Sequence, residues 1–245
     1  MKRIFVIIFL LVINNACKSP EFDINRSVLL VVDIQQGINP ANPLEANKDV
    51  IPNLEDIKIP EDWVKKGYTP EAVRSALVFA KETAMPNSIK TVELFHSKKI
   101  PIVYLRWGSH NPKALDMEPK VRKYHEQFLG NDPTKWGIFD IKIDPRLTVI
   151  DPGIEVIKTG HDGFTSSNLE YVLKNLNVNT IFLIGGHTNA CYLATAKSAK
   201  DKGYYTISVE DATTDALETT RISGIKKANF NQIIKTEDIN SILNK

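Results

Sequence analysis

The sequence predicts an α/β protein in which a mainly parallel sheet of about six strands is covered by helices on both faces. Three observations lead to this three-layer, doubly wound architecture. Short, continuous apolar runs are typical of strands buried on both faces. Segments with helical composition alternate with these runs, and a chain of 245 residues suits one large domain with a sizeable core.

Six apolar runs read as strands, and helical patterns separate most of them. The expected strands are 28–33 (VLLVVD), 100–106 (IPIVYLR), 154–158 (IEVIK), 180–185 (TIFLIG), 204–209 (YYTISV) and 232–235 (QIIK). The expected helices are 71–83, 88–98, 167–176, 191–202 and 218–230. This alternation favours a Rossmann-like order of strand, helix and strand.

Two connections are longer than a compact α/β domain needs. Residues 38–87 form an insertion rich in Pro and Asn, and residues 107–152 form a second long connection. Both follow strands on the edge where ligands bind in open α/β sheets, so we expect residues 38–87 and 107–130 to cover that edge and restrict access to Cys191. The domain is expected to span residues 27–245, after a tether at 17–26.

The N-terminus has the pattern of an export signal. Lys2 and Arg3 precede the apolar stretch 4–13, which is too short for a stable membrane span, and the sequence NNAC follows, ending at Cys17. This pattern resembles the lipobox of bacterial lipoproteins. It implies that residues 1–16 are removed, that Cys17 is lipidated, and that the protein is tethered to a membrane on the periplasmic or cell-surface side. Simple secretion with a free Cys17 is the alternative.

Charge and cysteine content narrow the choice of partners. Residues 1–16 hold two of the 31 basic residues and none of the 29 acidic ones, so the remaining chain is balanced and no nucleic-acid partner is expected. Two cysteines in an exported protein would suggest a disulfide. If Cys17 carries lipid, Cys191 is instead a lone thiol, which is either buried and inert or retained for its chemistry.

Three chemically distinct side chains fall at the carboxyl ends of the expected strands. Asp33 ends the first strand, Lys158 ends the third, and the fourth leads into a turn that carries Cys191 at the start of a helix. Taken singly, the Asp is a turn former and the Lys a solvated charge. Together they supply a proton acceptor and a cation for a thiol nucleophile, and the helix N-terminus supplies N–H donors for a carbonyl oxygen.

Three blocks that contain these residues resemble one family. VVDIQ, VIKTGHDGFTSSNL and LIGGHTNACYLATAKSA are similar, in this order, to the isochorismatase-like cysteine hydrolases, which include nicotinamidases and N-carbamoylsarcosine, ureidoacrylate and biuret hydrolases. The resemblance spans about residues 27–211. It implies a catalytic triad of Asp33, Lys158 and Cys191, and thus an amidohydrolase whose substrate is a small amide or ureide.

The resemblance also implies two backbone features of the nucleophile turn. The family commonly has a cis peptide bond at the position of Gly186 and His187, and an oxyanion hole formed by the backbone N–H groups of Ala190 and Cys191. Trp107, Phe164, His187 and Tyr192 are candidates to line the substrate pocket, with ordinary core packing as the alternative for each.

The sequence departs from the metal-dependent nicotinamidases of this family. These carry Asp-x-His after the second strand, whereas Gly108 stands here at the position of the Asp, with His110 two residues later. His125 and Glu126 could be imagined as further ligands, but lone histidines are more often packing or surface residues, so we expect no metal and no cofactor.

Three other functions stay open at this point: a metal-dependent nicotinamidase, a surface-tethered binding module of the same fold that has lost the reaction, and a phosphoacceptor switch domain. The sequence also leaves open whether the chain forms a homo-oligomer.

Overall fold

The computed structural model describes residues 20–35, 51, 53–57, 59, 61–129, 131–133 and 142–244. The expected export signal and Cys17 lie outside these residues, as does the first part of the insertion. No helix among the described residues is long and apolar enough to cross a membrane.

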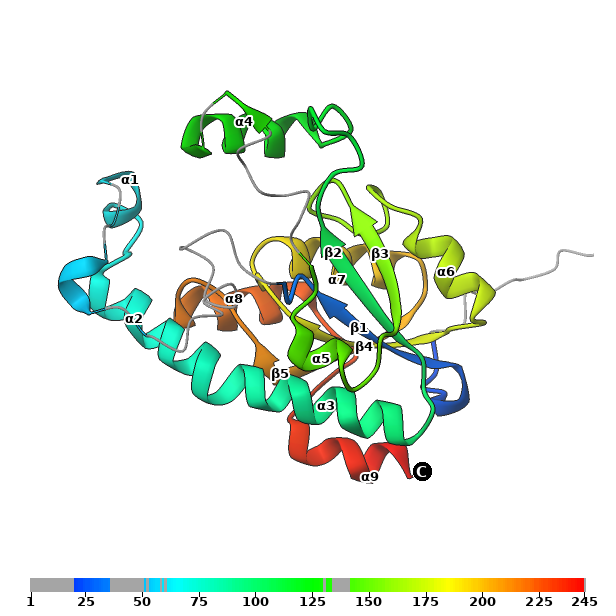
Figure 1. Ribbon diagram of the computed structural model, residues 1–245. Helices are drawn as coiled ribbons and strands as arrows, with labels where there is room; N and C mark the ends of the chain where they lie inside the picture. Colours follow the sequence, from blue (N-terminus) through cyan, green and yellow to red (C-terminus); the bar gives the residue numbers. More distant parts are fainter. Residues whose placement is uncertain are drawn as a thin grey trace, which may run out of the picture.

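The sheet has six strands, and all of its pairings are parallel, which confirms the predicted fold class (Figure 1). The strands are β1 (Ser27–Val32), β2 (Ile102–Trp107), β3 (Ile154–Lys158), β4 (Thr180–Gly185), β5 (Tyr205–Thr213) and β6 (Gln232–Ile234). Their order across the sheet is β3-β2-β1-β4-β5-β6. The chain therefore winds outward twice from the centre, and the direction reverses between β1 and β4, which is where doubly wound folds bind ligands.

The helices flank this sheet and continue past one end of it. They are α1 (Glu61–Val64), α2 (Pro70–Phe79), a π-helical segment (Ala80–Ala84), α3 (Met85–Ser97), α4 (Pro119–Leu129), α5 (Pro145–Thr148), α6 (Leu169–Asn175), α7 (Cys191–Asp201), α8 (Glu218–Ala228) and α9 (Ile239–Leu243). Short 3-10 turns lie at Ile24–Arg26, Leu54–Asp56 and Thr236–Asp238.

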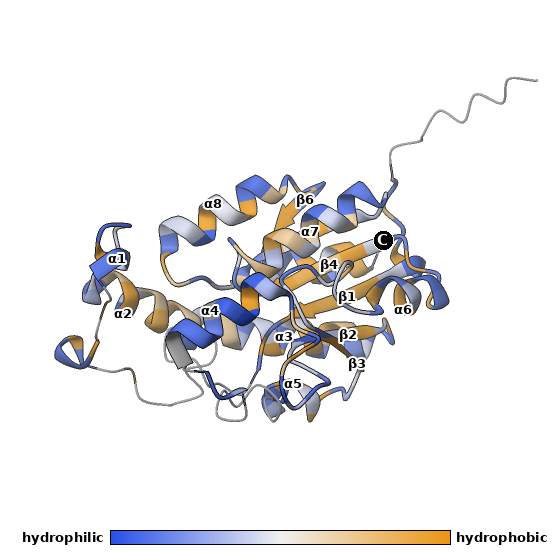
Figure 2. Cartoon of the chain, turned by 90° about the horizontal axis from the view of Figure 1, so that it is seen from above, coloured by the Kyte–Doolittle hydropathy of each residue, from blue (hydrophilic) through white to orange (hydrophobic). Residues whose placement is uncertain are grey.

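Alternate residues of each central strand face opposite hydrophobic cores. Leu29 and Val31 point into the core that contains α3, α5 and α9, whereas Val28 and Leu30 point into the core that contains α6, α7 and α8. Figure 2 shows α7 and α8 on one side of the apolar sheet and α3 and α5 on the other. Both faces are buried, which is why the strands read as continuous apolar runs.

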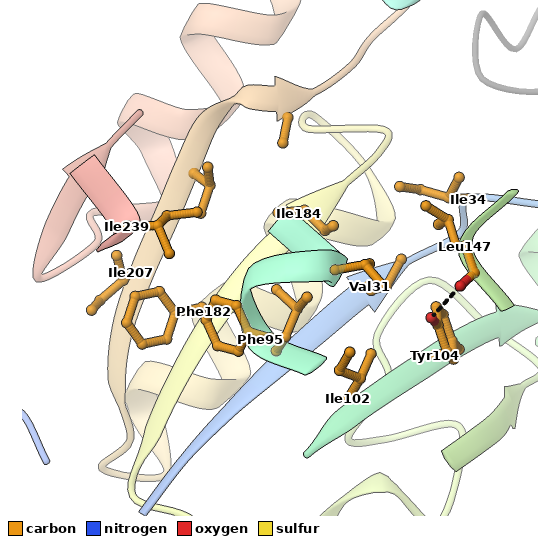
Figure 3. Close-up of a cluster of buried hydrophobic side chains, with 14 of the residues drawn as sticks. Val31, Ile34, Phe95, Ile102, Tyr104, Leu147, Phe182, Ile184, Ile207 and Ile239 are labelled. Atoms are coloured by element: carbon orange, nitrogen blue, oxygen red, sulfur yellow. Dashed lines mark hydrogen bonds between the residues drawn. The ribbon is translucent and has the colours of Figure 1, made fainter. Parts of the chain in front are cut away.

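Aromatic packing anchors the first of these cores (Figure 3). The ring of Phe95 on α3 meets that of Phe182 on β4 edge to face, with centroids 5.0 Å apart. Tyr104 of β2 lies in the same core, and its hydroxyl donates to the carbonyl oxygen of Leu147 at 3.4 Å. These contacts fix α3 and α5 against the central strands.

The two helices expected at 71–83 and 88–98 form one helical run from Pro70 to Ser97. Pro86 has no N–H and disfavours a regular helix around it. The run accommodates it through the π-helical segment just before, where the Met85 N–H reaches back to the carbonyl of Ala80. The expected break between the two helices is therefore absent.

Candidate active site

A buried ion pair lies at the carboxyl edge of the sheet. Asp33 follows β1, Lys158 ends β3, and Lys158 Nζ lies 2.9 Å from Asp33 Oδ2. The lysine side chain is fully buried, and its Nζ also donates to the carbonyl oxygen of Gly160 at 3.1 Å. An ammonium is costly to bury without a partner, so this pairing fixes both groups in one arrangement.

The backbone of Asp33 has the left-handed conformation, with φ of 54°. This conformation is uncommon for residues other than glycine, and it turns the carboxylate toward Lys158 as the chain leaves β1. The second carboxylate oxygen, Oδ1, is buried and accepts no hydrogen bond from the described residues. The oxygen that does not pair with Lys158 is therefore available to accept a proton.

Cys191 is the first residue of α7 and is half-buried. The pKa of the Cys191 thiol is raised to about 12; burial is the largest cause, the Lys158 ammonium lowers the pKa, and the Asp33 carboxylate raises it. Burial also opposes protonation of Lys158, but Asp33 and the thiol raise the pKa of that lysine above its usual value. At neutral pH the resting site thus contains a protonated thiol beside a lysine and carboxylate ion pair.

The nucleophile turn connects β4 to α7, and its peptide bond between Gly186 and His187 is cis, at the bond for which the family resemblance implies it. The Ala190 N–H donates to the carbonyl oxygen of His187 at 3.0 Å, and the Tyr192 N–H donates to the same oxygen at 3.1 Å. The Cys191 N–H forms no hydrogen bond within the described part of the chain. Of the two expected oxyanion donors, only Cys191 is free in this structure, and Ala190 would have to share its N–H.

Asp215 stabilises this turn through hydrogen bonds to its carboxylate. It is buried, and its Oδ2 accepts hydrogen bonds from Thr188 Oγ1 at 3.0 Å and from the Asn189 N–H at 2.8 Å. Its Oδ1 accepts from the Ala216 N–H at 2.8 Å and from Thr220 Oγ1 at 2.7 Å. The buried carboxylate thus joins the start of α8 to the residues just before Cys191.

One family model matches most of this chain. The family model described as isochorismatase domain matches residues 62–238, which include Lys158 and Cys191. The chain belongs to the isochorismatase family. The matched segment begins after β1, so Asp33 lies outside the matched segment.

A curated relative of this isochorismatase-family protein is the ureidoacrylate amidohydrolase RutB of Agrobacterium fabrum. It is 29% identical over 105 residues, which cover 42% of this chain and 43% of that protein. The match therefore spans less than half of the relative's length.

Solved structures of the family share the fold. A cysteine hydrolase from Pseudomonas syringae pv. phaseolicola has a TM-score of 0.60 and 18% identity, and the match covers 91% of this chain and 94% of that one. The N-carbamoylsarcosine amidase of Thermoplasma acidophilum has a TM-score of 0.55 and 18% identity, with coverage of 86% and 97%. At this level of identity the likeness concerns the fold alone.

Two of the four residues considered for the pocket of this isochorismatase-family protein pack in the core, which was the alternative for each. Phe164 packs against Tyr204 with ring centroids 5.7 Å apart, in the core between the sheet and α6, α7 and α8. Tyr192 is fully buried in the same core, where its hydroxyl bonds to Ser208 Oγ at 2.8 Å. Both side chains stabilise the scaffold beneath the site.

The other two candidates lie near the carboxyl edge. Trp107 ends β2, and its ring stacks on His125 of α4 with centroids 4.6 Å apart. His187 belongs to the nucleophile turn, and its Nδ1 lies 3.9 Å from Asp215 Oδ1. His187 keeps a quarter of its side chain exposed, so it can contact a ligand.

Sequence reasoning missed several residues that shape this edge. The side-chain amide of Gln35 accepts from the Trp107 N–H at 2.8 Å and donates to the Trp107 carbonyl oxygen at 3.0 Å, and so it extends the pairing of β1 and β2. Figure 1 shows α4 beyond the arrowhead ends of β2 and β3. Glu118, just before α4, also contacts the loop after β3. The spacing of apolar residues could not reveal these contacts, because each joins two segments that are distant in sequence.

The residues considered as metal ligands are not grouped as a metal site requires. The described residues contain no cluster of three or more His, Cys, Asp or Glu side chains placed to hold a metal ion. His125 is stacked on Trp107, and its Nδ1 lies 2.9 Å from the carbonyl oxygen of Val121. Its pKa is lowered by burial.

Proposed function

We propose that this isochorismatase-family protein is a cysteine amidohydrolase that cleaves a small amide or ureido C–N bond through a thioester intermediate. The observation that carries the proposal is the buried ion pair of Asp33 and Lys158 acting on the thiol of Cys191 at the N-terminus of α7. The printed activities of two relatives, an ureidoacrylate amidohydrolase and an N-carbamoylsarcosine amidase, support the choice of bond.

The high thiol pKa determines how the first step proceeds. A thiol with a pKa of about 12 is almost wholly protonated at neutral pH, so the nucleophile is generated during the attack. Asp33 accepts the thiol proton as Sγ bonds to the substrate carbonyl carbon. Lys158 stabilises the negative charge that develops on sulfur, and the Cys191 N–H with the α7 dipole stabilises the oxyanion.

Asp33 then serves as the acid and afterwards as the base. It returns the proton to the departing ammonia or amine, and the C–N bond breaks to leave an acyl or carbamoyl thioester on Cys191. Water attacks the thioester while Asp33 accepts a proton from it, and the proton passes to the sulfur as the acid product leaves. These steps use the side chains of Asp33, Lys158 and Cys191, the backbone N–H of Cys191 and one water molecule.

The test is the release of ammonia from a panel of small amides and ureides by the purified protein, with Cys191→Ser as the matched variant. A serine hydroxyl has a far higher pKa than a thiol, so Cys191→Ser should fold and lose nearly all turnover. A folded Cys191→Ser protein that keeps activity within a few fold of wild type would exclude the thioester mechanism.

We further propose that the chain is exported and acylated at Cys17, as the N-terminal sequence pattern predicts. The test is the mass of the N-terminal peptide of the protein recovered from the membrane fraction. A mass that corresponds to the unmodified peptide would refute this proposal.

A further inference from the structure

Glu118 joins the segment after β2 to the loop that carries the triad lysine. Its backbone N–H donates to the Thr159 carbonyl oxygen at 2.9 Å. Its Oε2 lies 3.7 Å from His161 Nδ1 and 3.4 Å from the His161 backbone nitrogen. A Cβ atom at position 160 would lie 2.7 Å from this Oε2, so the carboxylate packs directly on Gly160.

This contact brings the carboxylate close to the reacting groups. Glu118 packs on Gly160, and the carbonyl oxygen of Gly160 accepts the hydrogen bond from Lys158 Nζ. Gly160 is therefore the one residue between Glu118 and the ion pair. The side chains of Glu118 and His161 are each 44% exposed. Glu118 therefore faces solvent beside the loop that follows Lys158, and we call the surface formed by Glu118 and His161 the mouth of the site.

The groups of the triad contribute no net charge to this mouth at neutral pH. Lys158 and Asp33 form a 1:1 ion pair, and Cys191 is protonated. A charged substrate substituent therefore responds to the charged groups around the triad as well as to the local field of the ion pair.

Outside the triad, Glu118 is the charged group that acts most strongly on His161. Burial and Lys158 lower the pKa of His161, which leaves its imidazole neutral at pH 7 and above. Lys120 also acts on His161, but more weakly than Glu118 does. The mouth formed by these described residues thus has a negative character.

We propose that Glu118 determines the charge specificity of the site, so that it accepts uncharged or cationic small amides and ureides and rejects those with a carboxylate. This inference rests on the proposed function, because it assumes that the substrate reaches Cys191 through this mouth.

Two alkylating reagents test the inference without any known substrate. Iodoacetamide is uncharged and iodoacetate is anionic, and both react in the same way. The thiolate sulfur bonds to the methylene carbon, iodide leaves with the electrons of the C–I bond, and the thiol proton passes to solvent. The ratio of the iodoacetamide rate to the iodoacetate rate, divided by the same ratio for 2-mercaptoethanol, reports the charge preference of the mouth. We expect a corrected ratio of about 5 to 10 for Cys191 at low salt.

Glu118→Gln should reduce this corrected ratio several-fold toward 1. Glu126→Gln is the matched control, because it removes the same charge from α4 at a glutamate that pairs with Arg122 instead of His161. The wild-type ratio should also fall as salt is raised from 0.01 to 0.5 M.

The outcomes separate the two proposals. A corrected ratio near 1 in the wild-type protein, or an unchanged ratio in Glu118→Gln, would overturn the role of Glu118 while the nucleophile stands. Failure of both reagents to modify Cys191 would overturn the proposed nucleophile and this inference with it.

Discussion

Asp33 and Lys158 act on the Cys191 thiol in opposite directions, and this can be measured. Burial is the largest cause of the raised thiol pKa, Asp33 raises it further, and Lys158 lowers it. Asp33→Asn should therefore lower the thiol pKa, and Lys158→Met should raise it. The pH dependence of the iodoacetamide rate gives both values.

Asp33→Asn should affect the reactivity of the Cys191 thiol and the turnover of substrate in opposite directions. Asp33→Asn should make the thiol easier to ionise, yet it should reduce turnover by about 10² to 10⁴, because the proton acceptor and donor is lost. A thiol pKa that rises in Asp33→Asn would show that the carboxylate does not act on Cys191 as the structure indicates.

At the level of single residues, the sequence was most informative where a residue ends a strand. Asp33 and Lys158 could be placed at one edge of the sheet because parallel strands end on the same side. Tyr192 and Phe164 follow the alternative of core packing, because a turn or helix start near the site has one side that faces the core. Asp215 and Glu118 could not be found, since their roles depend on how loops fold onto each other.

Among the elements, α8 packs unusually closely on the nucleophile turn. A Cβ atom at Gly224 would lie only 2.2 Å from the carbonyl oxygen of Thr188. Gly224→Ala would raise the helix propensity of α8 by about 1 kcal/mol, but it must displace either the helix or the turn. We expect the protein to fold with lower stability and with turnover reduced at least tenfold.

Ser223→Ala is the matched control for this variant, because it changes the neighbouring residue of α8 and leaves Gly224 in place. Circular dichroism and thermal unfolding would check the fold, and ammonia release would check the site. Wild-type turnover in Gly224→Ala would mean that the turn can move without affecting Cys191.

The helical run from Pro70 to Ser97 shows the limit of sequence patterns for elements. A proline inside a helical pattern usually marks a boundary, and Pro86 lies in the gap between the two helices expected at 71–83 and 88–98. The π-helical segment before it removes the need for a boundary, and Asn87 and Ser88 then reach the end of β5 through hydrogen bonds of 3.2 and 3.4 Å to Asp211 and Ala212. These tertiary contacts override the local signal.

For the molecule as a whole, the buried thiol and lysine link stability to alkaline pH. The pKa of Cys191 is raised from 9.0 to about 12, and that of Lys158 is also raised. Above pH 9 the unfolded chain therefore loses protons that the folded protein keeps, so the free energy of unfolding must fall as pH rises. Each group contributes a slope of at most about 1.4 kcal/mol per pH unit.

Cys191→Ser removes the thiol part of this dependence. Urea unfolding between pH 8 and 10.5 should show a shallower decline for the variant than for the wild type, since serine does not titrate in this range. Parallel curves for the two proteins would contradict the raised thiol pKa.

The class of fold was predictable because both faces of the sheet are buried, which leaves continuous apolar strands in the sequence. The order of the strands was not, because no local pattern specifies which strands become neighbours. The length of β5 was also underestimated. It continues to Thr213 through a shift in register next to Gly185. The residues at its end are mostly polar, so the sequence there has the composition of a loop.

The chain enters the domain at the end of the sheet opposite to the triad. The Asp23 N–H donates to Thr180 Oγ1 at 3.1 Å, and Thr180 is the first residue of β4. Cys191 lies beyond the other end of that strand, after the turn that follows Gly185. A strand of six residues is about 20 Å long. If Cys17 is anchored in a lipid layer as proposed, Cys191 lies at the end of the sheet that is farther from the point where the described chain begins, so solutes rather than lipids would be the substrates it meets.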